Sequence, residues 1–204
     1  MKAVLNYLIA MLPFALVSVP FAALWRKSRR KGFIKNGTET TDAHEIVSIL
    51  FIMFMAALIS QTVIPKIEIT DAGIRFFQTG YNKYNLVPFK EIKLAINQGG
   101  TFFIVNFIGN QLVFAPIAFF TALLYNKPRI YKSVAITTAV SVFVEVCQIP
   151  QNRGSDIDDV ILNTLGGIIG YILYMIFSKL FPKFSADCKV KKLKPETPNE
   201  NTDI

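Results

Sequence analysis

The fold class is decided by residues 158–181, which read DDVILNTLGGIIGYILYMIFSKLF. After its two aspartates the stretch is mostly apolar, and it exceeds the roughly 20 helical residues needed to cross a hydrocarbon core of about 30 Å. Four similar stretches lie at residues 3–25, 44–64, 102–125 and 133–150. Their apolar runs are continuous rather than alternating, which favours helices over a β-barrel. The sequence therefore predicts an all-α membrane bundle of about five transmembrane helices.

The composition indicates a membrane protein rather than a soluble domain. Hydrophobic residues make up 52% of the chain, charged residues make up 18%, and the mean hydropathy is +0.40. Soluble domains seldom combine so few charges with so many apolar residues. The net charge of +8 does not indicate a nucleic-acid partner, because anionic lipid and membrane topology explain basic residues beside apolar stretches. Membrane lipid is therefore the expected partner.

The first apolar stretch is expected to stay in the protein as a helix. It is longer than the core of a signal peptide and ends in residues 26–31, RKSRRK, rather than in a cleavage site. With that basic run in the cytoplasm, most of the 22 Lys and Arg residues fall on inner segments, as the positive-inside rule requires. The N-terminus is then predicted outside and the C-terminus in the cytoplasm.

Two regions outside the predicted spans differ in character. The transmembrane domain takes residues 1–184, and the polar, Lys-rich tail at residues 185–204 is predicted to be disordered. The outer loop, residues 65–101, contains Pro88 at the start of a short helix that runs to about Ile96. That helix either lies in the membrane interface or forms a lid over the helix ends, and both readings stay open. Its apolar face and aromatic anchors would be formed by Phe89, Ile92, Ile96, Tyr81 and Tyr84.

The Cys and His residues do not indicate a disulfide or a metal site. Cys147 and Cys188 are predicted on opposite sides of the membrane, so one chain cannot bridge them. The single histidine, His44, falls within residues 42–45, DAHE, which read as a helix capping box. No metal-ligand spacing is present, and no cofactor is expected.

Polar side chains inside the predicted spans carry the functional signal. Such groups are costly in a membrane and usually face protein or a water-filled cavity. At about 1.5 Å of rise per residue, Asn106, Glu145 and Asn163 lie at similar depths below the outer face, in three different helices. Interhelical hydrogen bonds would explain one such group, whereas the whole set predicts a ligand-binding pocket at the outer face. The predicted site comprises Asn106, Asn110, Glu145, Gln148, Arg153, Asp156, Asp159 and Asn163, with Asp158 turned away.

A glycine-rich stretch follows Asn163 on the last predicted span. Gly166, Gly167 and Gly170 include a GxxxG spacing, which lets two helix backbones approach closely. These glycines are predicted to pack helices together. Whether the helices belong to one chain or to two copies, and hence the oligomeric state, is left open.

The order and spacing of several short segments resembles the VanZ-like membrane proteins. The resemblance runs from about residue 85 to residue 171 and implies a multi-pass protein of the bacterial cell membrane. It marks Glu145, Gln148, Arg153, Asp156, Asp159 and Asn163 as the shared site, with Asn106 and Asn110 facing it. The segments are NLVPF at 85–89, EVCQ at 145–148, RGSDIDDV at 153–160 and NTLGG at 163–167, together with Asn106, Asn110, Phe114 and Pro116.

The resemblance also bears on function, since the namesake of these proteins is associated with low-level resistance to the glycopeptide teicoplanin. With the polar pocket predicted above, we expect an envelope protein that binds or alters a lipid, a cell-wall precursor or a glycopeptide. One alternative is an enzyme acting on a lipid head group with Glu145 as acid or base, although no nucleophile set such as Ser-His or Cys-His is present. Another is a small transporter, which the lack of an internal repeat and the one-sided polar residues disfavour.

Overall fold

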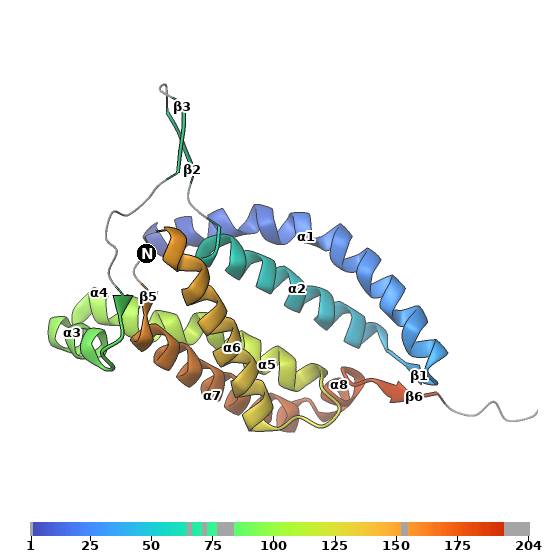
Figure 1. Cartoon of the computed structure of the whole chain (residues 1–204). Coiled ribbons are helices and arrows are strands. Elements are labelled where there is room, and N and C mark those ends of the chain that lie inside the picture. The colour runs from blue at the N-terminus through green and yellow to red at the C-terminus, as the bar shows by residue number, and fades with distance from the viewer. Residues whose placement is uncertain (1, 65–66, 71–72, 77–83, 152–154, 194–204) are drawn as a thin grey trace, which may run out of the picture.

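The computed structural model describes residues 2–64, 67–70, 73–76, 84–151 and 155–193, and most of them form an elongated helical bundle (Figure 1). Its long helices are α1 (Lys2–Lys35), α2 (Asp42–Thr62), α5 (Gly109–Leu124), α6 (Ile130–Gln148) and α7 (Ile157–Leu180). A short helix α4 (Gly100–Phe103) and a π-helical turn η1 (Ile104–Ile108) lead directly into α5. The third predicted span is therefore helical over residues 100–124.

Four helices of the described residues are long and apolar enough to cross a membrane. They are α1, α2, α6 and α7, and α5 is a shorter apolar helix that α4 and η1 extend. The prediction of an all-α membrane bundle is confirmed, whereas the direction in which it crosses the membrane stays a prediction. The first helix is longer than predicted, because it continues through the basic run as far as Lys35.

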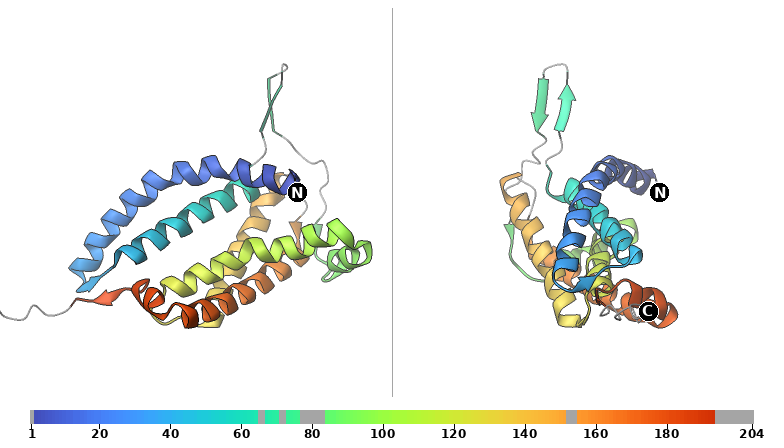
Figure 2. Two further views of the ribbon diagram at one scale, coloured as in Figure 1. Left: turned by 180° about the vertical axis from the view of Figure 1, so that it is seen from behind. Right: turned by 90° about the vertical axis from the view of Figure 1, so that its right-hand side faces the viewer.

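The helix α1 lies on the outside of the bundle and arches along α2 (Figures 1 and 2). Pro13 and Pro20 lie inside this helix, and each proline removes a backbone hydrogen bond, which bends a helix. The other long helices pack on one another, with α7 against both α5 and α6. Apolar contacts that include Leu58, Ile117 and Val144 join α2, α5 and α6.

Glycine residues let α7 approach α5 closely. A Cβ atom added at Gly166 would overlap the backbone of Gln111, and one added at Gly170 would overlap the backbone of Ala115. At Gly167 an added Cβ would crowd Thr137 of α6. The GxxxG face of α7 is therefore filled by helices of the same chain.

Polarity is distributed as in a membrane protein rather than as in a soluble one. Thr137 and Ser141 of α6 and Asn163 of α7 are buried between helices, whereas Phe21, Leu112 and Leu180 are exposed on the surface. Small and polar residues at helix contacts, with large apolar residues outside, suit a bundle surrounded by lipid. The exposed apolar surface is thus explained by the membrane.

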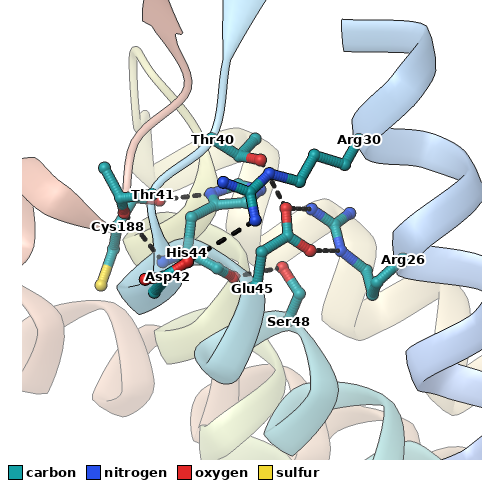
Figure 3. A network of polar contacts seen from close by, with 9 residues as sticks. All are labelled: Arg26, Arg30, Thr40, Thr41, Asp42, His44, Glu45, Ser48 and Cys188. Atoms are coloured by element: carbon teal, nitrogen blue, oxygen red, sulfur yellow. Dashed lines mark hydrogen bonds and ion pairs between the residues drawn. The ribbon is translucent and has the colours of Figure 1, made fainter. Parts of the chain in front are cut away.

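A buried ion pair joins α1 to α2 near the connection between them (Figure 3). Arg26 binds Glu45 through two hydrogen bonds, Nε to Oε2 at 2.8 Å and Nη2 to Oε1 at 3.0 Å. Thr40 donates to the same carboxylate. The predicted capping box at Asp42 is therefore wrong. Thr41 is the residue that caps α2, and it accepts from His44 N at 3.2 Å. The side chain of Glu45 binds Arg26.

The chain after α7 is ordered further than predicted. A short helix α8 (Pro182–Asp187) follows α7, and strand β6 (Lys191–Lys192) pairs with β1 (Thr38–Glu39) in the α1–α2 connection. Cys188 is completely buried, and its carbonyl accepts from Nδ1 of His44 at 2.6 Å. The prediction of disorder from residue 185 is wrong for residues 185–193, because apolar burial and strand pairing hold them. Residues 194–204 lie outside the described part.

The long loop between α2 and α4 contains several short elements. Strands β2 (Ile67–Thr70) and β3 (Gly73–Phe76) form an antiparallel hairpin. Strand β4 (Tyr84–Asn85) pairs in parallel with β5 (Ser155–Asp156), which immediately precedes α7. Helix α3 (Lys90–Gln98) follows β4, close to the predicted position of the short helix. The predicted anchor Tyr81 lies outside the described residues.

Candidate functional site

The candidate site lies where α7 begins, beside the end of α6, the start of α5, and β4 and α3 (Figure 1). This end of the bundle is opposite to the ion pair of Arg26 and Glu45. We call its side chains the polar cluster, and its described members are Asn85, Asn110, Ser141, Glu145, Asp156, Asp158, Asp159 and Asn163.

Asp156 connects three parts of the structure at the first residue before α7. Its carboxylate caps the helix by accepting from Asp158 N at 2.9 Å, the usual role of Asp at an N-cap. Both of its carboxylate oxygens accept from Asn85 Nδ2, at 3.0 and 3.1 Å. Its backbone N–H donates to Oε2 of Glu145 at 2.9 Å. The side chain and backbone of Asp156 thereby tie β4 and α6 to the start of α7.

Asp158 has a role that the sequence did not predict. It points away from the other carboxylates toward α3, and its residue is only 1% exposed. Oδ1 accepts from Phe89 N at 2.5 Å, and Oδ2 accepts from Glu91 N at 2.8 Å and Ile92 N at 3.2 Å. These N–H groups have no partner within their own helix turn, so a carboxylate from α7 completes the N-terminus of α3. An aspartate in the first turn of the last predicted span was the available signal.

A second layer of polar side chains lies one turn further along α7. Asn110 Nδ2 donates to Oδ1 of Asp159 at 2.6 Å, which joins α5 to α7. Asn163 Nδ2 donates to Oγ of Ser141 at 2.8 Å, which joins α7 to α6. Asn163 is 3% exposed, and its Oδ1 is buried and forms no hydrogen bond with the described residues. An amide acceptor is therefore left unused in the interior of the bundle.

Other predicted site residues are placed differently. Gln148 binds the end of α2, because its Nε2 donates to the carbonyl of Thr62 at 3.1 Å. Gln151 does the same at the carbonyl of Val63, and both amides satisfy carbonyl groups that a helix end leaves free. Asn106 lies in η1, but its side chain is outside the described part, and so is Arg153.

The chemistry of the polar cluster is that of hydrogen-bond acceptance. Its carboxylates accept from backbone N–H groups and from the amides of Asn85 and Asn110. Among the residues that the structure describes, no three His, Cys, Asp or Glu side chains are grouped so that they could hold a metal ion. The arrangement can thus bind donor groups such as hydroxyls, amides and amines.

A comparison with family models identifies the family of this chain. Residues 46–178 match the model of the VanZ/LLP1 family, which is more than half of the chain. The chain belongs to the VanZ/LLP1 family. No curated protein and no solved structure matches it. Together with the apolar helices, membership makes this VanZ/LLP1 chain a multi-pass membrane protein.

The matched region of this VanZ/LLP1 protein covers the polar cluster but not the whole structure. It begins early in α2 and ends near the end of α7, so it includes the residues from Asn85 to Asn163. The helix α1, with Arg26, and the segment after α7, with Cys188, lie outside it. The polar cluster thus lies entirely in the family region, whereas both residues of the opposite ion pair, Arg26 and Glu45, lie outside it.

Proposed function

We propose that this VanZ/LLP1 protein is a cell-envelope membrane protein whose polar cluster binds the polar head of a lipid or a cell-wall ligand at the outer face. Tolerance of the glycopeptide teicoplanin is the trait that we expect such binding to affect. The proposal depends on the direction of the bundle in the membrane and on an acceptor in its interior.

The direction is supported by where the basic residues gather. Basic residues lie in the last turns of α1, in the connection from α5 to α6, and in and around α8 and β6, all at the end opposite to the polar cluster (Figure 1). The positive-inside rule assigns such an end to the cytoplasm. The polar cluster then faces outward. The basic residues concerned are Arg26, Lys27, Arg29, Arg30, Lys31, Lys35, Lys127, Arg129, Lys132, Lys183, Lys189, Lys191 and Lys192.

The unused oxygen of Asn163 is the observation that carries the proposal. Leaving a buried acceptor without a donor costs about 1–3 kcal/mol, so an interior amide with a spare oxygen suits a partner that supplies an N–H or O–H group. Asp159 lies one turn away on α7, and Glu145 lies one turn beyond Ser141 on α6. Because these groups are acceptors, the expected ligand carries donors, as the hydroxyls and amines of sugars and peptides do.

The test compares two variants that both remove the hydrogen bond between Asn163 and Ser141, of which only one also removes the spare oxygen. Asn163→Leu removes the spare acceptor, whereas Ser141→Ala removes only the group to which Asn163 donates. Cells that express each variant are compared for the minimum inhibitory concentration of teicoplanin, at equal amounts of protein in the membrane. We expect Asn163→Leu to lose the tolerance of the wild type and Ser141→Ala to retain it.

Two results would contradict the proposal. One is unchanged tolerance in Asn163→Leu at equal membrane abundance, and the other is a wild-type protein that gives no more tolerance than an empty vector. Native mass spectrometry of the purified protein gives an independent measurement, since a lipid retained by the wild type should be lost in Asn163→Leu.

We do not propose transport, although buried polar residues continue along α6 from the polar cluster. Ser133, Thr137, Ser141 and Glu145 recur every fourth residue on one buried side of this helix. Thr137 donates to the carbonyl of Ser133 at 3.0 Å and packs against Gly167 of α7. The small residues of this set serve the close packing of α6 on α7.

A further inference from the structure

An exposed apolar segment at the same end of the bundle takes no part in the polar cluster's binding chemistry. Residues 86–89 read LVPF, and we call them the apolar tip. Leu86 is 76% exposed, Val87 is 61% exposed and Phe89 is 53% exposed. Single exposed apolar residues are ordinary, but three large ones within four residues form a patch that indicates a partner.

The apolar tip is held from both sides by polar side chains of the polar cluster. Before it, Asn85 accepts from Val87 N at 3.3 Å and donates to both carboxylate oxygens of Asp156. After it, Phe89 N donates to Asp158, and Phe89 has a φ of 66°, a left-handed conformation that is uncommon for a residue other than glycine. The tip is therefore presented in one fixed shape instead of collapsing onto the bundle.

The level of the tip along the bundle follows from the same contacts. Asn85 pairs with Asp156, directly before α7, and Phe89 contacts Asp158, the second residue of α7. The 24 residues of α7 extend about 36 Å, which exceeds a hydrocarbon core of about 30 Å by roughly one helical turn. The first turn of α7, and the apolar tip beside it, thus lie near the boundary between head groups and acyl chains.

We infer that the apolar tip is a membrane anchor that inserts Leu86, Val87 and Phe89 into the interface of the outer leaflet. Lipid is the occupant because large apolar residues, Ile104 and Leu112, are also exposed on the helix that enters the membrane at this end of the bundle. Exposed Lys90 and Lys93 follow the tip and match the charge of lipid phosphates. The inference concerns a surface separate from the ligand proposed for Asn163.

Tryptophan fluorescence can locate the tip. With the single tryptophan replaced by Trp25→Phe, a new tryptophan is introduced by Leu86→Trp, and the full chain is reconstituted in vesicles of phosphatidylcholine and phosphatidylglycerol. We expect blue-shifted emission, a loss of emission with lipids brominated at shallow acyl carbons, and little loss with acrylamide in water.

Two matched positions calibrate the measurement. Leu112→Trp lies on the exposed apolar surface of α5 and should be quenched by lipid bromine, whereas Glu39→Trp in exposed β1 should be quenched by acrylamide. Val87→Trp repeats the test if Leu86→Trp does not fold. Adding Asp158→Asn should release the tip and reduce its quenching by shallow bromine.

Two outcomes would overturn the inference. The first is emission from both Leu86→Trp and Val87→Trp that matches the Glu39→Trp control, which would place the tip in water. The second is protection from acrylamide in native membranes but not in vesicles of the purified protein, which would assign the tip to a protein partner instead of lipid.

Discussion

Asp158→Asn tests how the outer end of the bundle is held together. In the wild type one carboxylate oxygen accepts from Phe89 N, and the other accepts from Glu91 N and Ile92 N. An asparagine has nearly the same shape, but its NH₂ group cannot accept a hydrogen bond. Whichever way the amide is turned, at least one N–H group at the start of α3 then faces another donor.

The expected cost follows from the burial of these groups. A buried donor without an acceptor costs about 1–3 kcal/mol, and a hydrogen bond to a charged group contributes about 1.5–3 kcal/mol. Because Asp158 is 1% exposed, little water can replace the lost contact. We expect the free energy needed to open α3 to fall by about 3 kcal/mol, which corresponds to roughly hundredfold faster amide exchange over residues 89–98.

Hydrogen–deuterium exchange with mass spectrometry, on protein in lipid nanodiscs, measures this opening. The control is Asp187→Asn, which changes an exposed carboxylate at the opposite end, where it binds Lys191 at 2.7 Å. The control should leave exchange over residues 89–98 unchanged, and Asp158→Asn should leave α2 unchanged. Equal exchange over residues 89–98 in wild type and Asp158→Asn would refute the role assigned to this carboxylate.

Three further predictions concern stability, measured by thermal unfolding in detergent. Arg26→Met should destabilise the protein by about 3–5 kcal/mol, because Glu45 stays buried without its cation. The double variant Arg26→Met with Glu45→Met should recover much of this stability. An equal loss of stability in the single and the double variant would contradict the prediction. Gly170→Val should destabilise it by more than about 2 kcal/mol by forcing α7 away from the backbone of α5, whereas Gly32→Ala, with nothing within 4 Å, should not destabilise it. Burial lowers the pKa of Lys189 from 10.5 to about 8, so the unfolded chain binds more protons between these values and stability should rise from pH 8 toward pH 9. Lys189→Met should flatten that rise. Burial also raises the pKa of the Cys188 thiol, and this lowers the stability as the pH rises above 9.

Several features of the polar cluster were predictable because helix periodicity is local. Residues spaced by four along a helix lie on one side, so Asp159 with Asn163, and Ser141 with Glu145, could be grouped before any contact was known. The contacts themselves could not be predicted in this way. Gln148 lies seven residues after Ser141, which is two helical turns along the same side, yet it contacts α2. That contact depends on where α2 ends relative to α6.

At the end of the bundle that holds Arg26 and Glu45, local sequence patterns also failed to predict the contacts. Residues 42–45 have the local pattern of a capping box, but Arg26 from α1 takes the carboxylate of Glu45, and Thr41 caps the helix. The tail from residue 185 is polar enough to be predicted as disordered, but burial of Cys188 and pairing of β6 with β1 hold residues 185–193 in place. In both cases a contact between distant segments outweighs a local preference.

The sequence by itself determined that this chain is a bundle of membrane helices, which segments span, and where costly polar groups enter the spans. These properties follow from hydrophobic run length and helix period, which each segment carries alone. Only the tertiary structure decided that Asp158 completes α3, that Gly166 and Gly170 meet α5 of the same chain, and that Asn163 keeps an acceptor that no described residue uses. The physical reason is that hydrogen-bond partners and backbone approach depend on how helices are placed against one another, and no single segment contains that placement.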